Sequence, residues 1–366
     1  MKILKLVIVF LICFSSVCYA SEIDKNQFGV SNFLRKSEKY TRELNINISD
    51  IFDKIIKGKF DNKEFLKIIK RIVSQNSKDA LKTLSEIVLI ILINSILRAI
   101  CENLGNDSVS KIANYVQYLL LITILMKNFS EIITEIKESI ENLTAFSNSL
   151  IPLLTTLIIA TGKVTTSGVI EPILLVMVTF IGNFAKNILI PFILVGTVLG
   201  IVSKISPNIQ LDRISKYMKK SSVWIISIVM TLFISVAALE GGLTSNIDDV
   251  AKKTGKSVIS AAVPVVGGVI GDALETITGY SNLLKNAVGT IGIITIICIC
   301  LKPIIKLAIY TILYYISVAL VEIIADKNIT EIMEQMAETF KIMLSIFFMM
   351  TVMLIIGLAV VMKITG

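Results

Sequence analysis

Long stretches of this chain are almost free of charged residues, and that feature most constrains what the chain can fold into. A hydrocarbon core about 30 Å thick is crossed by about 20 apolar residues in a helix. Apolar segments of comparable length recur along the chain, near 85–100, 112–128, 146–161, 169–186, 188–203, 222–239, 257–271, 287–301, 303–324 and 341–363. Charged residues make up 17% of the chain and crowd into residues 21–82 and a few short loops. The sequence therefore predicts an all-α, polytopic integral membrane protein with about seven to ten membrane segments.

The first 20 residues have the pattern of a signal peptide. Lys2 and Lys5 precede a short apolar run, and the segment ends on small residues at Cys18 and Ala20. This order of basic, apolar and small residues is typical of a secretory signal. An uncleaved membrane anchor is the alternative. With either reading, the segment that follows is expected outside the cytoplasm.

Residues 21–82 form the one substantial hydrophilic segment, and we expect it to be extracytoplasmic, basic and helical. Apolar residues recur at helical spacing over 49–57, which predicts a short amphipathic helix. Asp61 and Glu64 resemble the start of a second helix, because an acidic residue three positions after an N-cap can close a capping box. The membrane domain is expected to begin at residue 83 and to continue to residue 366.

Charges in two polar stretches give an expected topology. The stretch 204–220 is rich in Lys and Arg and holds one Asp, so it is expected in the cytoplasm. The stretch 127–149 is acidic and is expected to be an external loop. The two assignments agree if the three apolar segments between them all cross the membrane. Segments 146–161 and 257–271 are short and contain proline, so a re-entrant path is the alternative for each.

Proline spacing indicates an internal repeat. Pro152 and Pro264 are 112 residues apart, and so are Pro191 and Pro303. We therefore predict parallel repeat units over roughly 110–220 and 221–340, followed by a final span over 341–363. Because proline removes a backbone donor, each of the four prolines is expected to mark a helix break.

Residue types exclude most enzyme chemistry. The chain has no histidine, which removes histidine-based acid–base catalysis and histidine-ligated metal sites. Cys298 and Cys300 lie two positions apart in an apolar run and are interpreted as apolar fillers. The net charge is +8, but aromatic residues are not interleaved with the basic residues in the way typical of nucleic-acid binding. We therefore expect no enzyme activity, no cofactor, no metal site and no nucleic-acid ligand.

Ionisable residues in or beside apolar runs are the candidate pore-lining or partner-contact positions. Such a charge costs at least about 2.5–3.5 kcal/mol at bilayer depth, so it usually faces a bundle interior or water. These residues are Glu171, Lys186, Asp272, Glu275, Lys302, Lys306 and Glu322. The alternative is that each lies at an interface and extends towards water. Lys302 and Lys306, one turn apart, are expected on one helical face.

Two glycine pairs have the spacing that lets membrane helices approach closely. Gly196 is paired with Gly200, and Gly267 with Gly271. We predict a helix-packing role for all four. A pore-lining or partner-docking loop over 255–289 is the alternative for the second pair.

Several long segments resemble one known family. They are EPILLVMVTFIGNFAKNILIPFILVGTVLGIVSKIS (171–206), ALEGGLTSNIDDVAKKTGKSVISAAVPVVGGVIGDALETITGY (238–280), LKNAVGTIGIITIICICLKPIIKLAIY (284–310) and VEIIADKNI (321–329). On these segments the chain resembles the stage III sporulation protein AE family of endospore-forming Firmicutes. The resemblance covers essentially the whole chain.

The resemblance implies a role and a set of partners. Such a protein is a membrane subunit of a channel or secretion-like complex between mother cell and forespore, required for sporulation after engulfment. Its implied partners are membrane proteins of the same operon, a secretion-type ATPase, ring-forming subunits and a forespore membrane protein across the intermembrane space. Its implied location is the mother-cell membrane around the forespore. A stand-alone secondary transporter and a passive membrane scaffold are the alternatives that the residues leave open.

Overall fold

The computed structural model describes residues 27–44, 46–56, 63–103, 107–205, 211–236, 267–322, 325 and 327–363. These residues form helices, with a short described turn such as 161–163 between some of them, and they include no strand, so the prediction of an all-α protein is confirmed. The expected signal peptide and Pro264 lie outside the described residues.

The helices fall into a short N-terminal group and a set of long helices. The short ones are η1 (Gln27–Gly29), α2 (Val30–Thr41), η2 (Arg42–Leu44) and α3 (Ile48–Ile56). The long set comprises α4 (Lys63–Asn103), α5 (Asp107–Ala160), α6 (Val164–Phe184), the π-helical turn η3 (Ala185–Leu189), α7 (Ile190–Ile205), the helix Asp212–Val236, α9 (Gly267–Val321) and α10 (Lys327–Lys363).

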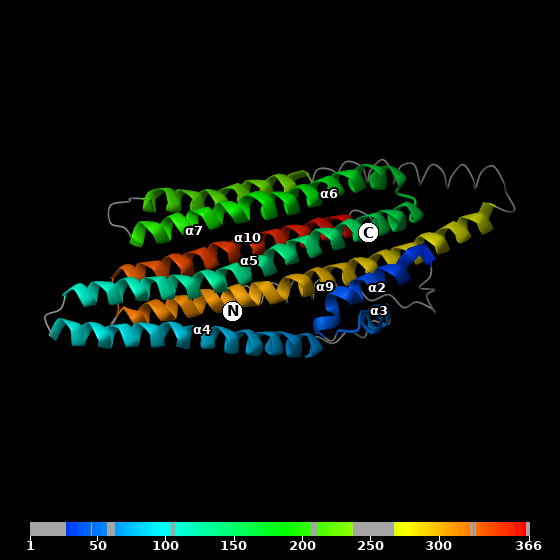
Figure 1. Cartoon of the computed structure of the whole chain (residues 1–366). Helices are drawn as coiled ribbons and strands as arrows, with labels where there is room; N and C mark the ends of the chain where they lie inside the picture. Colours follow the sequence, from blue (N-terminus) through cyan, green and yellow to red (C-terminus); the bar gives the residue numbers. More distant parts are fainter. Residues whose placement is uncertain are drawn as a thin grey trace.

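The long helices lie side by side in one elongated bundle (Figure 1). Helix α9 is central, because it packs against α10, α5 and α4 and also against the short helices α2 and α3. Helices α6 and α7, joined through η3, flank the bundle on the side of α5 and α10. The bundle therefore has two sides, one covered by α2, α3 and α4 and the other by α6, η3, α7 and the helix 212–236 (Figure 1).

Two helices are much longer than a bilayer is thick. Helix α5 has 54 residues and α9 has 55, which at 1.5 Å per residue gives each a length of about 80 Å. The predicted external loop over 127–149 was wrong, because this stretch lies inside α5. The polar stretch stays helical because some of its charged side chains find partners on neighbouring helices, such as Glu135 with Lys306 of α9.

Prolines do not end the helices that contain them. Pro152 lies inside α5 and Pro303 inside α9, so the predicted breaks are wrong at both positions. Pro191 follows the π-helical turn η3, where the N–H of Ile190 donates to the carbonyl of Ala185. Proline leaves one carbonyl without its usual partner, and a wider turn just before it accommodates that change. Pro191 and Pro303 thus lie in different local structures, and the predicted repeat is not confirmed.

Five of the described helices are long and apolar enough to cross a membrane: Leu119–Ala160, Ser167–Lys204, Asp212–Val236, Thr278–Val321 and Lys327–Met362. The chain is thus a multi-pass membrane protein. The apolar segments that we separated by composition merge in pairs. Segment 112–128 and all but the last residue of 146–161 lie in α5, and 287–301 and most of 303–324 lie in α9.

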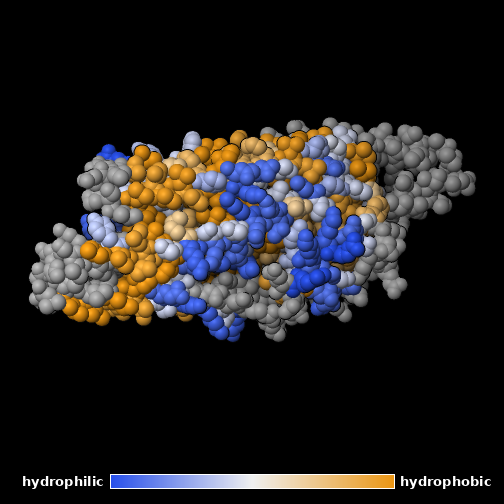
Figure 2. Space-filling model, viewed as in Figure 1, coloured by the Kyte–Doolittle hydropathy of each residue, from blue (hydrophilic) through white to orange (hydrophobic). Residues whose placement is uncertain are grey.

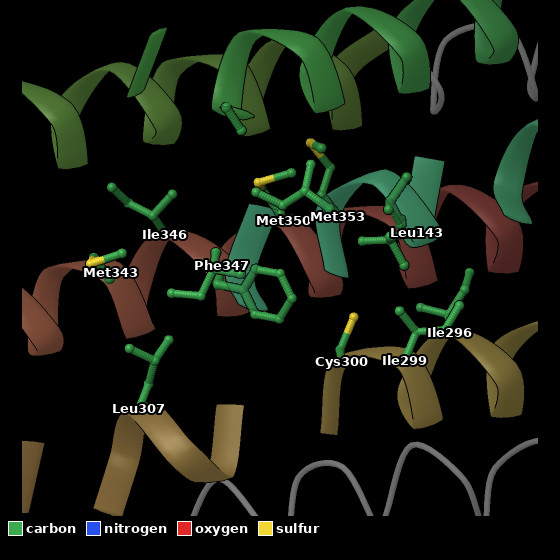
Figure 3. Close-up of a cluster of buried hydrophobic side chains, with 14 of the residues drawn as sticks. Leu143, Ile296, Ile299, Cys300, Leu307, Met343, Ile346, Phe347, Met350 and Met353 are labelled. Carbon is green, nitrogen blue, oxygen red and sulfur yellow. The ribbon is translucent and has the colours of Figure 1, made fainter. Parts of the chain in front are cut away.

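The core is an apolar seam between α5, α9 and α10. Figure 3 shows side chains of the three helices pointing towards one another, from Leu143 on α5 through Ile299 and Cys300 on α9 to Phe347 on α10. Cys298 and Cys300 are both buried free thiols. Close packing of this kind holds long helices together in lipid, where no hydrophobic driving force acts between them.

The N-terminal helices pack on the bundle and are not a separate arm. The ring of Phe146 on α5 lies 5.8 Å from the ring of Phe33 and 5.6 Å from that of Tyr40, both on α2. Helix α3 agrees with the helix predicted over 49–57. Helix α4 runs through the predicted domain boundary at residue 82 without interruption.

Hydrophilic residues gather around the middle of the molecule on the face shown in Figure 2, while hydrophobic residues predominate to the left of them and along much of the upper edge. The left end is where the C-terminal part of α4 meets the N-terminal part of α5 (Figure 1). Exposed apolar side chains there include Leu92, Ile96 and Leu119, as expected of a surface that faces lipid.

Candidate functional site

A buried lysine joins two helices near the end of the bundle where α7 ends and α10 begins. Lys219, on the helix 212–236, is 2% exposed. Its ammonium donates to the side-chain oxygen Oε1 of Gln335 on α10 at 2.6 Å and to the backbone carbonyl of Gln335 at 3.2 Å. A buried charge without such acceptors would cost several kcal/mol, so this contact is a requirement for burying the lysine.

Charged residues extend this contact towards the surface. The amide nitrogen of Gln335 lies 3.4 Å from Oδ1 of Asp212, and the Asp212 carboxylate pairs with Lys204 at 3.4 Å and with Lys216 at 2.8 Å. Lys204 also pairs with Glu331 at 3.0 Å. We call Lys204, Asp212, Lys219, Glu331 and Gln335 the Lys219 cluster. It connects α7 and the helix 212–236, which are neighbours in the sequence, to α10, which is more than 100 residues away.

A glycine makes room for the Lys219 cluster. A Cβ atom added at Gly200 would lie 2.7 Å from Oγ of Ser215 and 2.9 Å from Oε1 of Gln335. A Cβ at Gly196 would meet Met218 at 3.1 Å. The structure thus places Gly196 and Gly200 where α7 closely approaches the helix 212–236.

Hydroxyl groups complete the junction between α7 and α10. Thr197 and Thr339 are both buried, and their hydroxyl oxygens are 2.9 Å apart. Thr339 also donates to the backbone carbonyl of Gln335 at 2.7 Å. Ser215 is buried, and its hydroxyl has no hydrogen-bond partner among the residues that the structure describes. The junction between α7 and α10 is therefore lined by polar side chains.

A second charged group lies at the middle of α5 and α9. Oε2 of Glu135 is 2.6 Å from Nζ of Lys306, and Oε1 is 3.6 Å from Nζ of Lys302. Lys302 and Lys306 thus lie on one face of α9 and share a single carboxylate. We call these three residues the Glu135 cluster. Lys302 is 50% exposed, so its share of the interaction is screened more than that of Lys306.

Polar contacts also follow the seam between α5 and the segment α6–η3. Lys186 forms an ion pair with Glu141 of α5. Glu171 accepts a hydrogen bond from the hydroxyl of Thr155 at 2.7 Å. Asn148 donates to the hydroxyl of Thr179 at 3.1 Å, midway between these two contacts. This row fixes the register of α6 on α5.

Of the remaining positions predicted from the sequence, one lies away from these groups and the others have side chains that the structure does not describe. Glu322 is exposed in the turn after α9, and its backbone N–H donates to the carbonyl of Val318. Asp272, Glu275, Gly267 and Gly271 lie on the first turns of α9, where side chains are not described. Their proposed pore-lining, partner-contact or packing roles stay predictions.

Sequence reasoning missed the Lys219 cluster. The stretch 204–220 was interpreted as a basic cytoplasmic loop, yet the helix begins at Asp212 and Lys219 is buried. One signal could have indicated this: Ser215, Ser222 and Ile226 continue the buried face of an amphipathic helix through Lys219. Its partner Gln335 lies in a different segment, and nothing local in the sequence points to it.

Chemically, the two clusters hold charged groups inside the bundle and connect helices. They contain no nucleophile–base pair of the kind that covalent catalysis needs. Among the described residues no group of three Cys, Asp or Glu side chains is arranged to hold a metal ion. An all-helical membrane bundle with charged residues paired inside it is typical of channel, transporter and membrane-complex subunits.

Comparison with known proteins identifies the family. The model of the stage III sporulation protein AE family matches residues 46–365. The chain belongs to this family, and membership implies a role in sporulation. Stage III sporulation protein AE of Bacillus subtilis (strain 168) is 27% identical over 241 residues, which cover 66% of this chain and 60% of the relative. The match thus spans less than two thirds of that relative's length. No solved structure matches the chain.

Proposed function

We propose that this chain is a multi-pass membrane subunit of a channel or secretion-like complex between mother cell and forespore, required for sporulation after engulfment. The observation that carries the proposal is the family match over residues 46–365. The five helices able to cross a membrane are compatible with a large membrane subunit. The chain acts without catalysis of its own and works in the mother-cell membrane around the forespore.

The partners proposed are the other membrane proteins of the same sporulation operon, a secretion-type ATPase, ring-forming subunits and a forespore membrane protein. The exposed surface of the helices α2 and α3 favours a partner on the extracytoplasmic side. They pack on α5 and α9 and leave charged residues such as Arg35, Lys36 and Asp50 exposed. If the N-terminal segment lies outside the cytoplasm, this surface faces the intermembrane space.

A stand-alone secondary transporter is the second candidate, and the Lys219 cluster favours it. Buried ionisable residues in membrane helices often lie on ion or substrate pathways. Every charged member of the Lys219 cluster has a partner within the chain, however, and pairing of this kind also serves helix packing alone. In a passive scaffold, these charges would have no role other than helix packing.

Isolation from sporulating cells separates these candidates. The tagged full-length chain is solubilised in mild detergent after engulfment, and the proteins that accompany it are identified. A subunit is expected to co-purify with the membrane proteins and the ATPase of the operon, while an unrelated multi-pass protein with the same tag does not. Recovery of the chain alone, together with transport by the purified chain in vesicles, would favour the transporter instead.

A further inference from the structure

One side of the bundle carries charged side chains at the middle of its length. The glutamates of α5 there are exposed, and the side chain of Glu141, which pairs with Lys186 of η3, is 55% exposed. Lys302 of α9, which belongs to the Glu135 cluster, is 50% exposed. We call the following five residues the charged face: Glu131, Glu138, Glu141, Lys186 and Lys302.

The charged face lies level with the middle of α10. A small apolar pocket between α5, η3 and α10 is lined by Ile136 and Ile140, by Ala185 and by Met350, among others. Ile136 and Ile140 are neighbours of Glu138 on α5, and Ala185 precedes Lys186. These contacts place the charged face at the same height in the bundle as the part of α10 around Met350.

Another side of the bundle is apolar at this height. The hydroxyl of Ser227, on the helix 212–236, donates to the sulfur of Met349 on α10 at 3.9 Å. Trp224 and Ile228 flank Ser227 and are exposed, Trp224 by 67%. At one height, therefore, the bundle exposes charged residues on one side and large apolar residues on another.

The helix 212–236 fixes this height within the bilayer. It has 25 residues, or about 38 Å at 1.5 Å per residue. A hydrocarbon core about 30 Å thick covers about 20 of them. Ser227 is at least nine residues from either end of the helix, so it lies at hydrocarbon depth whichever part of the helix crosses. Through Met349, the charged face lies at that depth too.

Lipid is the wrong neighbour for the charged face. Each charge placed against lipid at bilayer depth costs at least about 2.5–3.5 kcal/mol. A protein neighbour is also unfavourable, because lysine and glutamate are depleted in the cores of protein interfaces and their desolvation is costly. Water keeps these half-exposed ion pairs solvated, so it is the neighbour that fits them.

We propose that the charged face lines a water-filled passage within the membrane, while the side that bears Trp224 and Ile228 faces lipid. The seam between α5, α9 and α10 is filled by apolar side chains, so the passage lies alongside the bundle and further subunits enclose it. Its description as a passage rests on the function proposed above, whereas contact of the charged face with water does not.

Reaction with a charged thiol reagent tests the contact with water. Glu138→Cys and Ile228→Cys are introduced separately into the full-length chain after its native cysteines are replaced by alanine. Membranes from the sporulating host are frozen and thawed so that the reagent reaches both sides. The reactive species is the thiolate, which forms in water and not in lipid. Glu138→Cys is therefore expected to react at least tenfold faster than Ile228→Cys, and equal rates would overturn the proposal.

The same variants distinguish water from a protein neighbour. If Glu138→Cys reacts slowly in membranes but fast in the chain purified alone in detergent, a partner covers the charged face and the proposal is wrong. Fast reaction in membranes, together with normal sporulation after deletion of the gene, would overturn the proposed function and leave the contact with water standing.

A second pair of variants keeps the native cysteines. Ile228→Lys places a charge against lipid and is expected to lower the yield of folded protein from membranes at least tenfold. Glu138→Lys exchanges one solvated charge for another and is expected to leave that yield unchanged. Size-exclusion chromatography of equal amounts of solubilised membrane measures both yields. An equal loss for Glu138→Lys would refute the assignment of the charged face to water.

Discussion

Lys219 and Gln335 are 116 residues apart in the sequence, yet the ammonium of Lys219 donates to both the side-chain oxygen and the backbone carbonyl of Gln335. The contact joins the helix 212–236 to α10 through a side chain that is 2% exposed. The donor is charged and its acceptors are neutral. Removing Lys219 alone and removing the Gln335 side chain alone should therefore destabilise the protein by different amounts. That asymmetry gives the first prediction.

Gln335→Leu is expected to destabilise the protein more than Lys219→Met. Gln335→Leu leaves a buried ammonium without its side-chain acceptor, a change that costs about 2–4 kcal/mol. Lys219→Met removes the charge itself, so its cost is smaller. The double variant is expected to recover most of the loss, because two apolar side chains then pack together. Unfolding of the purified protein in mild detergent measures all three. Additive losses in the double variant would show that the two residues do not act as a pair.

Gly200→Ala is expected to destabilise the protein, while Gly168→Ala is not. The new methyl group at Gly200 would lie 2.7 Å from Oγ of Ser215 and 2.9 Å from Oε1 of Gln335, so the Lys219 cluster must shift. Gly168 lies on α6, and a Cβ there meets nothing within 4 Å. Alanine at that helical position is expected to stabilise by up to about 1 kcal/mol. Thermal unfolding of the two variants side by side measures the difference, and equal effects would contradict the close approach at Gly200.

The three residues of the Glu135 cluster are expected to differ in their effect on stability. Glu135→Gln removes the carboxylate that both lysines share, so it should cost the most. Lys306→Met removes the 2.6 Å contact and should cost less, while Lys302→Met should cost less than about 0.5 kcal/mol because Lys302 is half exposed. Chemical unfolding in detergent gives the order. If Lys302→Met proved the most damaging, a role beyond pairing with Glu135 would follow.

Phe146→Ala is expected to loosen α2 from the bundle. The substitution removes a buried ring that contacts both Phe33 and Tyr40, and such changes cost about 3–5 kcal/mol. Limited proteolysis should then cut within residues 30–56 sooner than in the native chain. Phe180→Ala is the control, because this exposed ring lies on α6, away from α2. Unchanged protection of the N-terminal helices would mean that other contacts hold them.

Sequence patterns were sufficient for the class of fold and for local features. Apolar segment length predicted an all-α membrane protein, and helical spacing predicted α3 to within one residue at each end. The four-residue spacing of Lys302 and Lys306 placed both on one face of α9. These features depend on residues close together in the chain, which is why pattern reasoning could find them.

Features that depend on distant partners were missed. From its local sequence, the 127–149 stretch resembles a loop. In the structure it is helical, and the carboxylate of Glu135 has a partner in Lys306, 171 residues away. From its local sequence, Lys219 resembles a solvent-exposed lysine of a loop. Its contact with Gln335 is what allows it to be buried. Pro152 and Pro303 resemble helix breaks because proline costs a backbone hydrogen bond, yet packing along α5 and α9 outweighs that loss. In each case a tertiary contact overrides the local preference.

Deleting the gene in its spore-forming host tests the proposed function most directly. Engulfed forespores are scored for size and for late forespore gene expression, with the native chain restored at a second site as the control. The account predicts small, collapsing forespores with silent late genes, both corrected by the native chain. Forespores of normal size that express late genes and mature into spores would contradict it.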